Sequence, residues 1–258
     1  MKRVGQMACF GIETGTSGQP AGKAGFYGPD ATKPIEVTRV ARAVPLGQAR
    51  ELSNGMTPHN MTESRERLIA AATELFFGGG FHNVGIAEIC DVGRVNKGTF
   101  YHFFPSKLDL LLEVIDNYVN DIAAKYREIA QDNDSPARKL RSVFMVPQKQ
   151  NEAWKSVHGT SSGCFLGNVI LELALTEPVV RDKARWALDQ WSLALQPVVE
   201  EFLKAENIKN LDAPAAAEVL IGIMQGAHVM AKARNDSGVF ANYGQLAVEM
   251  IRAAGNPK

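Results

Sequence analysis

Residues 94–107 of the chain read RVNKGTFYHFFPSK, and this stretch predicts a short helix that is ended by a proline. Asn96 is a favoured N-cap residue, because its side-chain oxygen can accept a free backbone N–H of the first turn. Gly98 leaves room for close approach of another backbone. Pro105 disfavours helical geometry at the residue before it, so the helix ends there. Ser106 can then cap a following helix.

The charges of the same stretch suit contact with DNA. Arg94, Lys97 and Lys107 supply three positive charges, and the stretch contains no acid. A helix that carries basic and aromatic side chains outward fits the major groove, with phosphates on either side. We expect groove contacts from Lys97, Thr99, Tyr101 and His102, and phosphate contacts from Thr62, Lys107 and Arg94. With the two residues that shape the helix start, the expected DNA-binding set is Thr62, Arg94, Asn96, Lys97, Gly98, Thr99, Tyr101, His102 and Lys107.

Two helices are predicted before this stretch. Residues 62–77 (TESRERLIAAATELFF) place apolar side chains at the spacing of one helical face, with Thr62 as N-cap and the glycines at 78–80 as the end. Residues 86–92 form a second, short helix, followed by a turn at Gly93. A helix followed by a helix-turn-helix and a proline stop is a DNA-binding arrangement.

At these residues the chain resembles the TetR family of bacterial transcriptional regulators, from about residue 62 to residue 112. The matching elements are Glu74-Leu75-Phe76, Gly80-Phe81, residues 86–89 (IAEI), residues 95–104 (VNKGTFYHFF) and Ser106-Lys107. The resemblance implies that the second helix of the motif enters the major groove and that a homodimer reads a roughly palindromic double-stranded operator. It also implies that a small-molecule effector, bound in the C-terminal domain, releases the DNA.

Two positions depart from the family pattern. Val84 stands where a threonine commonly caps the second helix and touches a phosphate, which puts that contact in doubt. Arg94 stands where a glycine is common in the turn; it either adds a charge near DNA or is a solvated turn residue.

Composition sets limits on the class of protein. The chain has 258 residues, 45% of them hydrophobic, and a formal net charge of zero, which argues against a heavily basic nucleic-acid coat protein. Residues 61–107 hold five basic and five acidic residues, so DNA affinity must come from local charge placement. Three cysteines without a CxxC pair fit a reducing cytosol, and we expect no metal site and no cofactor. Since no apolar run approaches the roughly 20 residues that span a bilayer, we expect a cytoplasmic protein without membrane contact.

Residues 1–60 differ in composition from the rest of the chain. They hold nine glycines and five prolines with few periodic apolar positions, so we expect a mostly disordered extension. One interpretation is an arm that tracks DNA, since seven basic residues face four acidic ones. The other is an inert tail or a mis-assigned start, with the true start at Met56 or Met61.

The remaining residues predict an all-α fold. Helices are expected over 107–130, from Pro136 through Phe144, over 164–175, from Pro178 to about Lys204, over 215–234 and over 239–254, with a loop that includes some helical turns over 148–163. We therefore expect a three-helix DNA-binding head at 61–107 and a helical ligand-binding and dimerisation domain at 108–258. Small residues on the penultimate helix allow close helix approach, in a dimer interface or within one chain: Ala215, Ala216, Ala217, Gly222, Gly226 and Ala227.

The candidate effector pocket combines apolar and aromatic residues with a few polar ones, a composition that a plain helical core shares. Asn168 lies in an apolar helix, so its amide needs a hydrogen-bond partner. We expect His228 to be a core residue whose ring is hydrogen-bonded, rather than a metal ligand. The candidate lining residues are Phe144, Trp154, Cys164, Phe165, Asn168, Trp186, Trp191, Met224 and His228.

The sequence leaves three other functions to consider. Cys164 begins an apolar helix, and a thiol at a helix N-terminus has a lowered pKa, so an oxidant- or electrophile-sensing regulator is one alternative to a packed core cysteine. Cys90 is expected in the core. Residues 159–163 (GTSSG) match the G-x-S-x-G string of hydrolases, but that elbow needs a preceding strand, so we expect no enzyme and no catalytic residue. A helical binding protein without DNA recognition is the last alternative; the outward polar set of residues 97–107 speaks against it.

Overall fold

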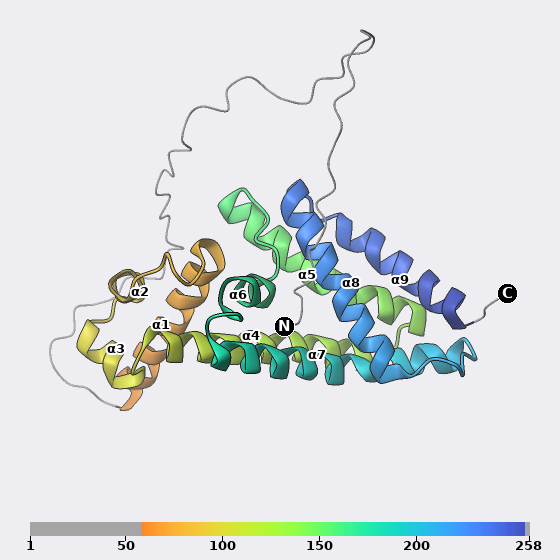
Figure 1. Ribbon diagram of the computed structural model, residues 1–258, viewed down its shortest axis with the longest axis horizontal. Helices are drawn as coiled ribbons and strands as arrows, with labels where there is room; N and C mark the ends of the chain where they lie inside the picture. The colour runs from red at the N-terminus through yellow and green to blue at the C-terminus, as the bar shows by residue number, and fades with distance from the viewer. Residues whose placement is uncertain (1–57, 256–258) are drawn as a thin grey trace, which may run out of the picture. The chain divides into compact units, whose positions relative to one another are not determined.

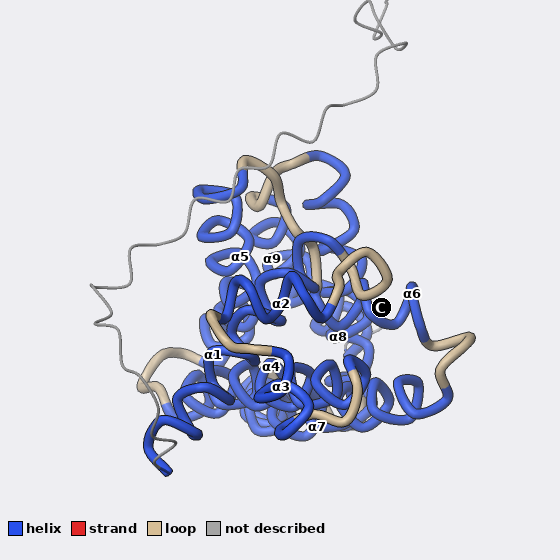
Figure 2. Tube along the Cα trace, turned by 90° about the vertical axis from the view of Figure 1, so that its left-hand side faces the viewer, coloured by secondary structure: helices blue, strands red, loops and turns tan. Residues whose placement is uncertain are grey.

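A computed structural model describes residues 58–255, and within that range every regular element is a helix (Figure 1). The elements are α1 (Pro58–Gly79), α2 (Ile86–Gly93), α3 (Lys97–Phe103), α4 (Lys107–Gln131), α5 (Pro136–His158), α6 (Phe165–Leu173), α7 (Pro178–Ala205), α8 (Ala213–Arg234) and α9 (Val239–Gly255). Figure 2, viewed from the side of α2 and α3, likewise contains only helix and loop in the described part. The all-α prediction is confirmed.

The first three helices form a small head around a shared core. Leu68 of α1, Ile89 of α2 and Phe100 of α3 are fully buried there. Gly93, the last residue of α2, lies so close to α1 that an added Cβ would stand 3.3 Å from the backbone oxygen of Arg67. A larger residue at this position would push the two helices apart, so the glycine fixes how closely α2 packs on α1.

The helix α4 joins the head to the remaining helices. Ser106 caps it, since its hydroxyl accepts the backbone N–H of Asp109 at 3.2 Å. The buried face of α4 lies along α7, while α5 lies along α9 and α8 packs against both α7 and α9 (Figure 1). One continuous core extends from the head into these helices, so the head and the body are in direct contact.

Two sequence predictions of helix ends are wrong. The helix α1 begins at Pro58, so Thr62 lies in its second turn and is not its N-cap. The helix α5 continues through Pro147 to His158, where the sequence predicts a loop with only some helical turns. Trp154 anchors this extension by packing against Phe77 of α1, with ring centroids 4.7 Å apart. Such long-range packing stabilises a polar segment whose sequence alone carries no helical periodicity.

The predictions for residues 1–57, including the disordered extension and the alternative starts, lie outside the described residues. Within residues 58–255, no helix is both long enough and apolar enough to cross a membrane.

Candidate DNA-binding face and effector cavity

The turn between α2 and α3 has the geometry that a helix-turn-helix requires. Arg94 closes α2 in the left-handed region, with φ of 52°, a conformation that glycine adopts more easily. Its departure from the family pattern is therefore tolerated at the cost of some backbone strain. Asn96 then caps α3 as predicted: its Oδ1 accepts the Thr99 backbone N–H at 2.8 Å and the Thr99 hydroxyl at 3.1 Å.

The outward face of α3 holds the residues predicted to enter the groove. Lys97, Tyr101 and His102 are exposed, Tyr101 to 55% of its full area. Within the described residues, their polar ends have no hydrogen-bond partner. Thr99 is half-buried and its hydroxyl is engaged with the cap, while Phe100 on the opposite side is fully buried. The helix thus holds one face in the core and offers Lys97, Tyr101 and His102 to a partner.

The Asn96 cap can be tested by its loss. Asn96→Ala should lower the free energy of unfolding by about 1 kcal/mol, because the first turn of α3 loses the acceptor for the Thr99 N–H. Chemical denaturation of the purified protein measures this change. Asn96→Ser keeps a capping oxygen and should stay near the wild-type value; an equal loss in both variants would contradict the capping role.

Lys107 has a different role from the one predicted. Its ammonium donates hydrogen bonds to the backbone oxygens of Phe81 at 2.7 Å and Val84 at 2.8 Å, and it lies 4.1 Å from the centre of the Phe81 ring. Burial lowers the pKa of this ammonium. Lys107 therefore holds the loop between α1 and α2, and the predicted phosphate contact is wrong. Val84, at the unusual position, is buried beside Gly79 in the core of the head.

The same loop is bound from the other side by Glu172 of α6. Its carboxylate accepts the backbone N–H of Phe81 at 2.9 Å and that of His82 at 2.7 Å. Glu172 is missing from the predicted sites because it lies about 90 residues from the loop along the chain. Its signal in the sequence is that it is the one charged residue in the apolar stretch 164–175. A side chain of the body thus holds two amides of the DNA-binding head.

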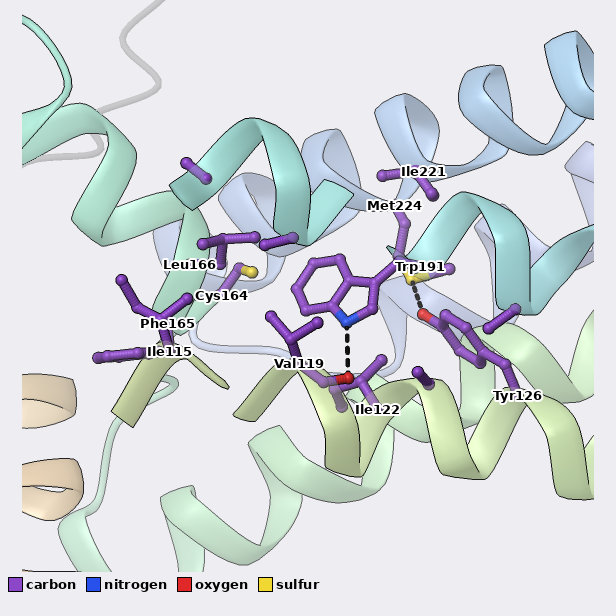
Figure 3. Close-up of a cluster of buried hydrophobic side chains, with 14 of the residues drawn as sticks. Ile115, Val119, Ile122, Tyr126, Cys164, Phe165, Leu166, Trp191, Ile221 and Met224 are labelled. Atoms are coloured by element: carbon purple, nitrogen blue, oxygen red, sulfur yellow. Dashed lines mark hydrogen bonds between the residues drawn. The ribbon is translucent and has the colours of Figure 1, made fainter. Parts of the chain in front are cut away.

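A small enclosed cavity lies between α4, α5, α6, α7 and α8. Four predicted pocket residues line it, namely Cys164, Trp191, Met224 and His228. The residues that sequence reasoning missed are Tyr118, Ile122, Tyr126, Val146, Pro147, Gln150 and Gln225. The Trp191 indole N–H donates to the Val119 backbone oxygen at 3.2 Å, and the Tyr126 hydroxyl donates to the Met224 sulfur at 3.2 Å (Figure 3). The free space is about 10 Å³, which is about the least that can hold a single water.

The other predicted pocket residues lie elsewhere. Phe144 packs against Gly244 of α9, where an added Cβ would stand 3.0 Å from the Phe144 Cβ. Trp154 stacks on His158 with ring centroids 3.8 Å apart, and the Trp186 ring lies under the Lys183 ammonium at 4.3 Å. Phe165 is buried in the core against the rings of Phe77 and Tyr118.

Asn168 finds its partners outside the enclosed cavity. Its amide donates to the Ser162 backbone oxygen at 3.1 Å, and its carbonyl oxygen accepts the Lys232 ammonium at 3.3 Å. Together with Glu172 it lines an open cleft of about 400 Å³ beside the C-terminal end of α1.

The Cys164 thiol is less acidic than the sequence suggested. The residue does cap α6, since its sulfur accepts the Gly167 N–H at 3.4 Å. Burial nevertheless raises the pKa of the thiol, because the cost of removing a thiolate from water exceeds the stabilisation from the helix N-terminus and the neighbouring hydrogen bonds. The prediction of a lowered pKa is wrong. Cys90 is buried in the head, as expected.

The GTSSG segment at 159–163 connects α5 to α6. The Ser161 hydroxyl donates to Asn151 Oδ1 at 2.6 Å and is buried. Because a helix precedes the segment, it lacks the strand that places the serine of a nucleophile elbow.

Two domain families match the chain. Residues 68–114 match "Bacterial regulatory proteins, tetR family", and residues 138–245 match "Tetracyclin repressor-like, C-terminal domain". The HTH-type transcriptional repressor NemR of Escherichia coli K12 is 25% identical over 183 residues, 69% of this chain and 88% of that protein. The HTH-type transcriptional repressor DhaR of Mycobacterium sp. strain GP1 is 27% identical over 168 residues, 64% and 81% of the two chains.

Solved structures share the fold. A regulatory protein TetR from Rhodobacter sphaeroides superposes with a TM-score of 0.63 and 25% identity, covering 72% of this chain and 97% of that one. The reduced form of Escherichia coli NemR superposes with a TM-score of 0.62 and 22% identity, covering 72% and 95%.

Proposed function

The chain belongs to the TetR family of bacterial transcriptional regulators, and from this we propose that it is a homodimeric repressor released from a palindromic operator by a small molecule. The observation that carries the proposal is the outward face of α3, where Lys97, Tyr101 and His102 are exposed and their polar ends have no hydrogen-bond partner within residues 58–255, while the Asn96 cap and Phe100 fix the helix. Its partner is double-stranded DNA, so it acts in the cytoplasm. We propose no catalytic activity.

An apolar face on α8 and α9 supports the dimer. Val219 and Val229 of α8 are 60% and 61% exposed, and Leu246 and Met250 of α9 are 53% and 56% exposed. Between the two valines, Gly222 and Gly226 are exposed as well, and an added Cβ at either would meet no atom within 4 Å. Two copies of this helix pair can bury these side chains in a four-helix bundle.

The helix α6 offers a physical link between effector and DNA. Its N-cap, Cys164, lines the enclosed cavity, and Glu172 near its other end holds the loop of the head. A ligand that moves α6 changes the position of that loop. Release follows only if the ligand binds more tightly to the arrangement of heads that does not fit the operator.

We expect Glu172→Ala to weaken the hold of the body on the head. The amides of Phe81 and His82 lose their charged acceptor, so their hydrogen exchange should accelerate about tenfold, the effect of losing roughly 1.4 kcal/mol of bonding. Amide exchange measured with residue resolution tests this. Glu177→Ala, on the loop before α7, serves as the control and should leave both amides protected; unchanged exchange in Glu172→Ala would remove the link.

Lys97→Ala tests the DNA-binding face. If Lys97 contacts a phosphate in each half-site, the variant should lose affinity and its salt slope should fall by about 1 per contact, about 2 for the dimer. Operator titrations at several salt concentrations measure both. Lys209→Ala, an exposed lysine after α7, is the control for net charge. A slope equal to that of the wild type would place Lys97 away from phosphate.

A thiol-sensing mechanism through Cys164 receives less support. Cys164 is only 4% exposed, and burial raises the pKa of its thiol. Little of the reactive thiolate therefore forms, and an oxidant or electrophile has poor access to it. A helical protein without DNA recognition is also less well supported, because it does not account for the exposed basic and aromatic side chains of α3.

A further inference from the structure

The enclosed cavity also points to the kind of effector. We propose that the effector is a small uncharged compound of about one ring that carries a hydroxyl group, such as a phenol, and that it hydrogen-bonds to His228 and Tyr126. This inference rests on the proposed function, because it names the ligand of that regulator. It is argued from the charge, the polar atoms and the size of the cavity.

The charge of the cavity favours a neutral ligand. Among the described residues that line it, none carries a charge at neutral pH. His228 is 5% exposed, and its burial lowers its pKa to about 4, so it stays neutral as well. A carboxylate or an ammonium would enter without an opposite charge to offset its loss of hydration. The aromatic walls formed by Tyr118, Tyr126 and Trp191 favour a ring instead.

The polar atoms of the cavity call for a hydroxyl. The His228 ring has a hydrogen bond to the Gly163 backbone, but within residues 58–255 its Nδ1 is buried and has no partner, which is rare for a polar atom in a protein interior. A hydroxyl can donate or accept, so it satisfies Nδ1 in either tautomer of the ring. The Tyr126 hydroxyl donates to the Met224 sulfur, a weak acceptor, and can turn to a ligand oxygen instead. Both His228 and Tyr126 therefore offer a polar atom to a ligand hydroxyl.

The size of the cavity limits the ligand to a compact molecule. With a free volume of about 10 Å³, the cavity must open before anything larger than water enters. Gln150 and Gln225 on its wall are half-buried and have flexible side chains. Pro147 on the same wall has no backbone N–H, so one hydrogen bond of α5 is missing there. We expect the helix to bend most easily at this point. A single ring can enter only if these residues move, so the ligand we infer is no larger than that.

Calorimetric titration of the full chain with three matched probes tests the proposal. 4-Methylphenol carries the hydroxyl, toluene lacks it, and 4-methylbenzoate carries a charge. We expect 4-methylphenol to bind at least about tenfold more tightly than toluene, the effect of one satisfied buried group, and 4-methylbenzoate to give no measurable heat. Equal or tighter binding of 4-methylbenzoate, or no binding by either neutral probe, would overturn the proposal.

Variants identify the hydrogen-bonding residues. His228→Leu should bring the affinity for 4-methylphenol down to that for toluene, and Tyr126→Phe should give a smaller loss. His158→Leu, an exposed histidine outside the cavity, is the control and should bind like the wild type. Full affinity in both cavity variants would overturn the assignment of His228 and Tyr126. Since the titration contains no DNA, it stands apart from operator binding: failure of operator binding alone would remove the proposed function and leave the ligand class intact.

Discussion

Replacing Tyr101 by alanine should lower operator affinity about 100-fold while leaving the protein folded. The ring is 55% exposed and touches Phe100 only through an edge contact with centroids 5.3 Å apart, so its loss costs the core little. A good contact to a base edge contributes about 1–3 kcal/mol, and a dimer loses it in both half-sites. The combined loss of about 3 kcal/mol corresponds to the expected factor.

Operator titration at physiological salt, together with thermal unfolding of the same samples, measures this effect. Val157→Ala provides the control, because Val157 is 64% exposed on α5, outside the DNA-binding head. We expect the control to match the wild type in both measurements. Wild-type affinity in Tyr101→Ala would show that α3 does not present this residue to the groove.

Acid should destabilise the protein through His228, the second large effect that we expect. The ring is buried and neutral in the folded chain, where its pKa is about 4, whereas an unfolded histidine titrates near 6.5. As the pH falls below 6.5, the unfolded chain takes up a proton that the folded chain does not. The contribution of neutral His228 to the free energy of unfolding should therefore be complete above pH 6.5. It should be lost between pH 6.5 and 4, where the free energy of unfolding falls by about 3 kcal/mol.

Denaturant unfolding of the wild type and His228→Leu across this pH range separates His228 from the other titrating groups. The variant should lack this part of the loss, so the stability difference between the two proteins should shift by about 3 kcal/mol in favour of the variant as the pH falls from 6.5 to 4. His158→Leu removes an exposed histidine and should keep the wild-type dependence. Parallel curves for the wild type and His228→Leu would mean that His228 takes up its proton equally well in the folded chain.

Local signals in the sequence account for the DNA-binding head. The N-cap of α3 depends on a contact between Asn96 and Thr99, three residues apart, and the end of the helix depends on the proline at 105. Such contacts can be read from spacing alone. Arg94 could be placed in the turn in the same way, although its left-handed backbone became evident only in the structure.

Residues that act across long chain separations were missed or assigned another role. The sequence predicts a phosphate contact for Lys107, yet its ammonium binds backbone oxygens 23 and 26 residues away. Glu172 and the cavity residue Tyr118 gain their roles from helices that the sequence does not place side by side. The Cys164 pKa was misjudged for a related reason: the helix start is local, but the burial that outweighs it comes from the packing of several helices.

The most direct test of the central claim is in vitro selection of genomic DNA fragments by the purified protein at physiological salt. The account predicts recovery of a few fragments that share a palindromic site and bind a dimer of the protein, each half-site contacted by one copy of α3. Recovery of random fragments by folded protein would contradict specific operator recognition and with it the assignment of the outward face of α3.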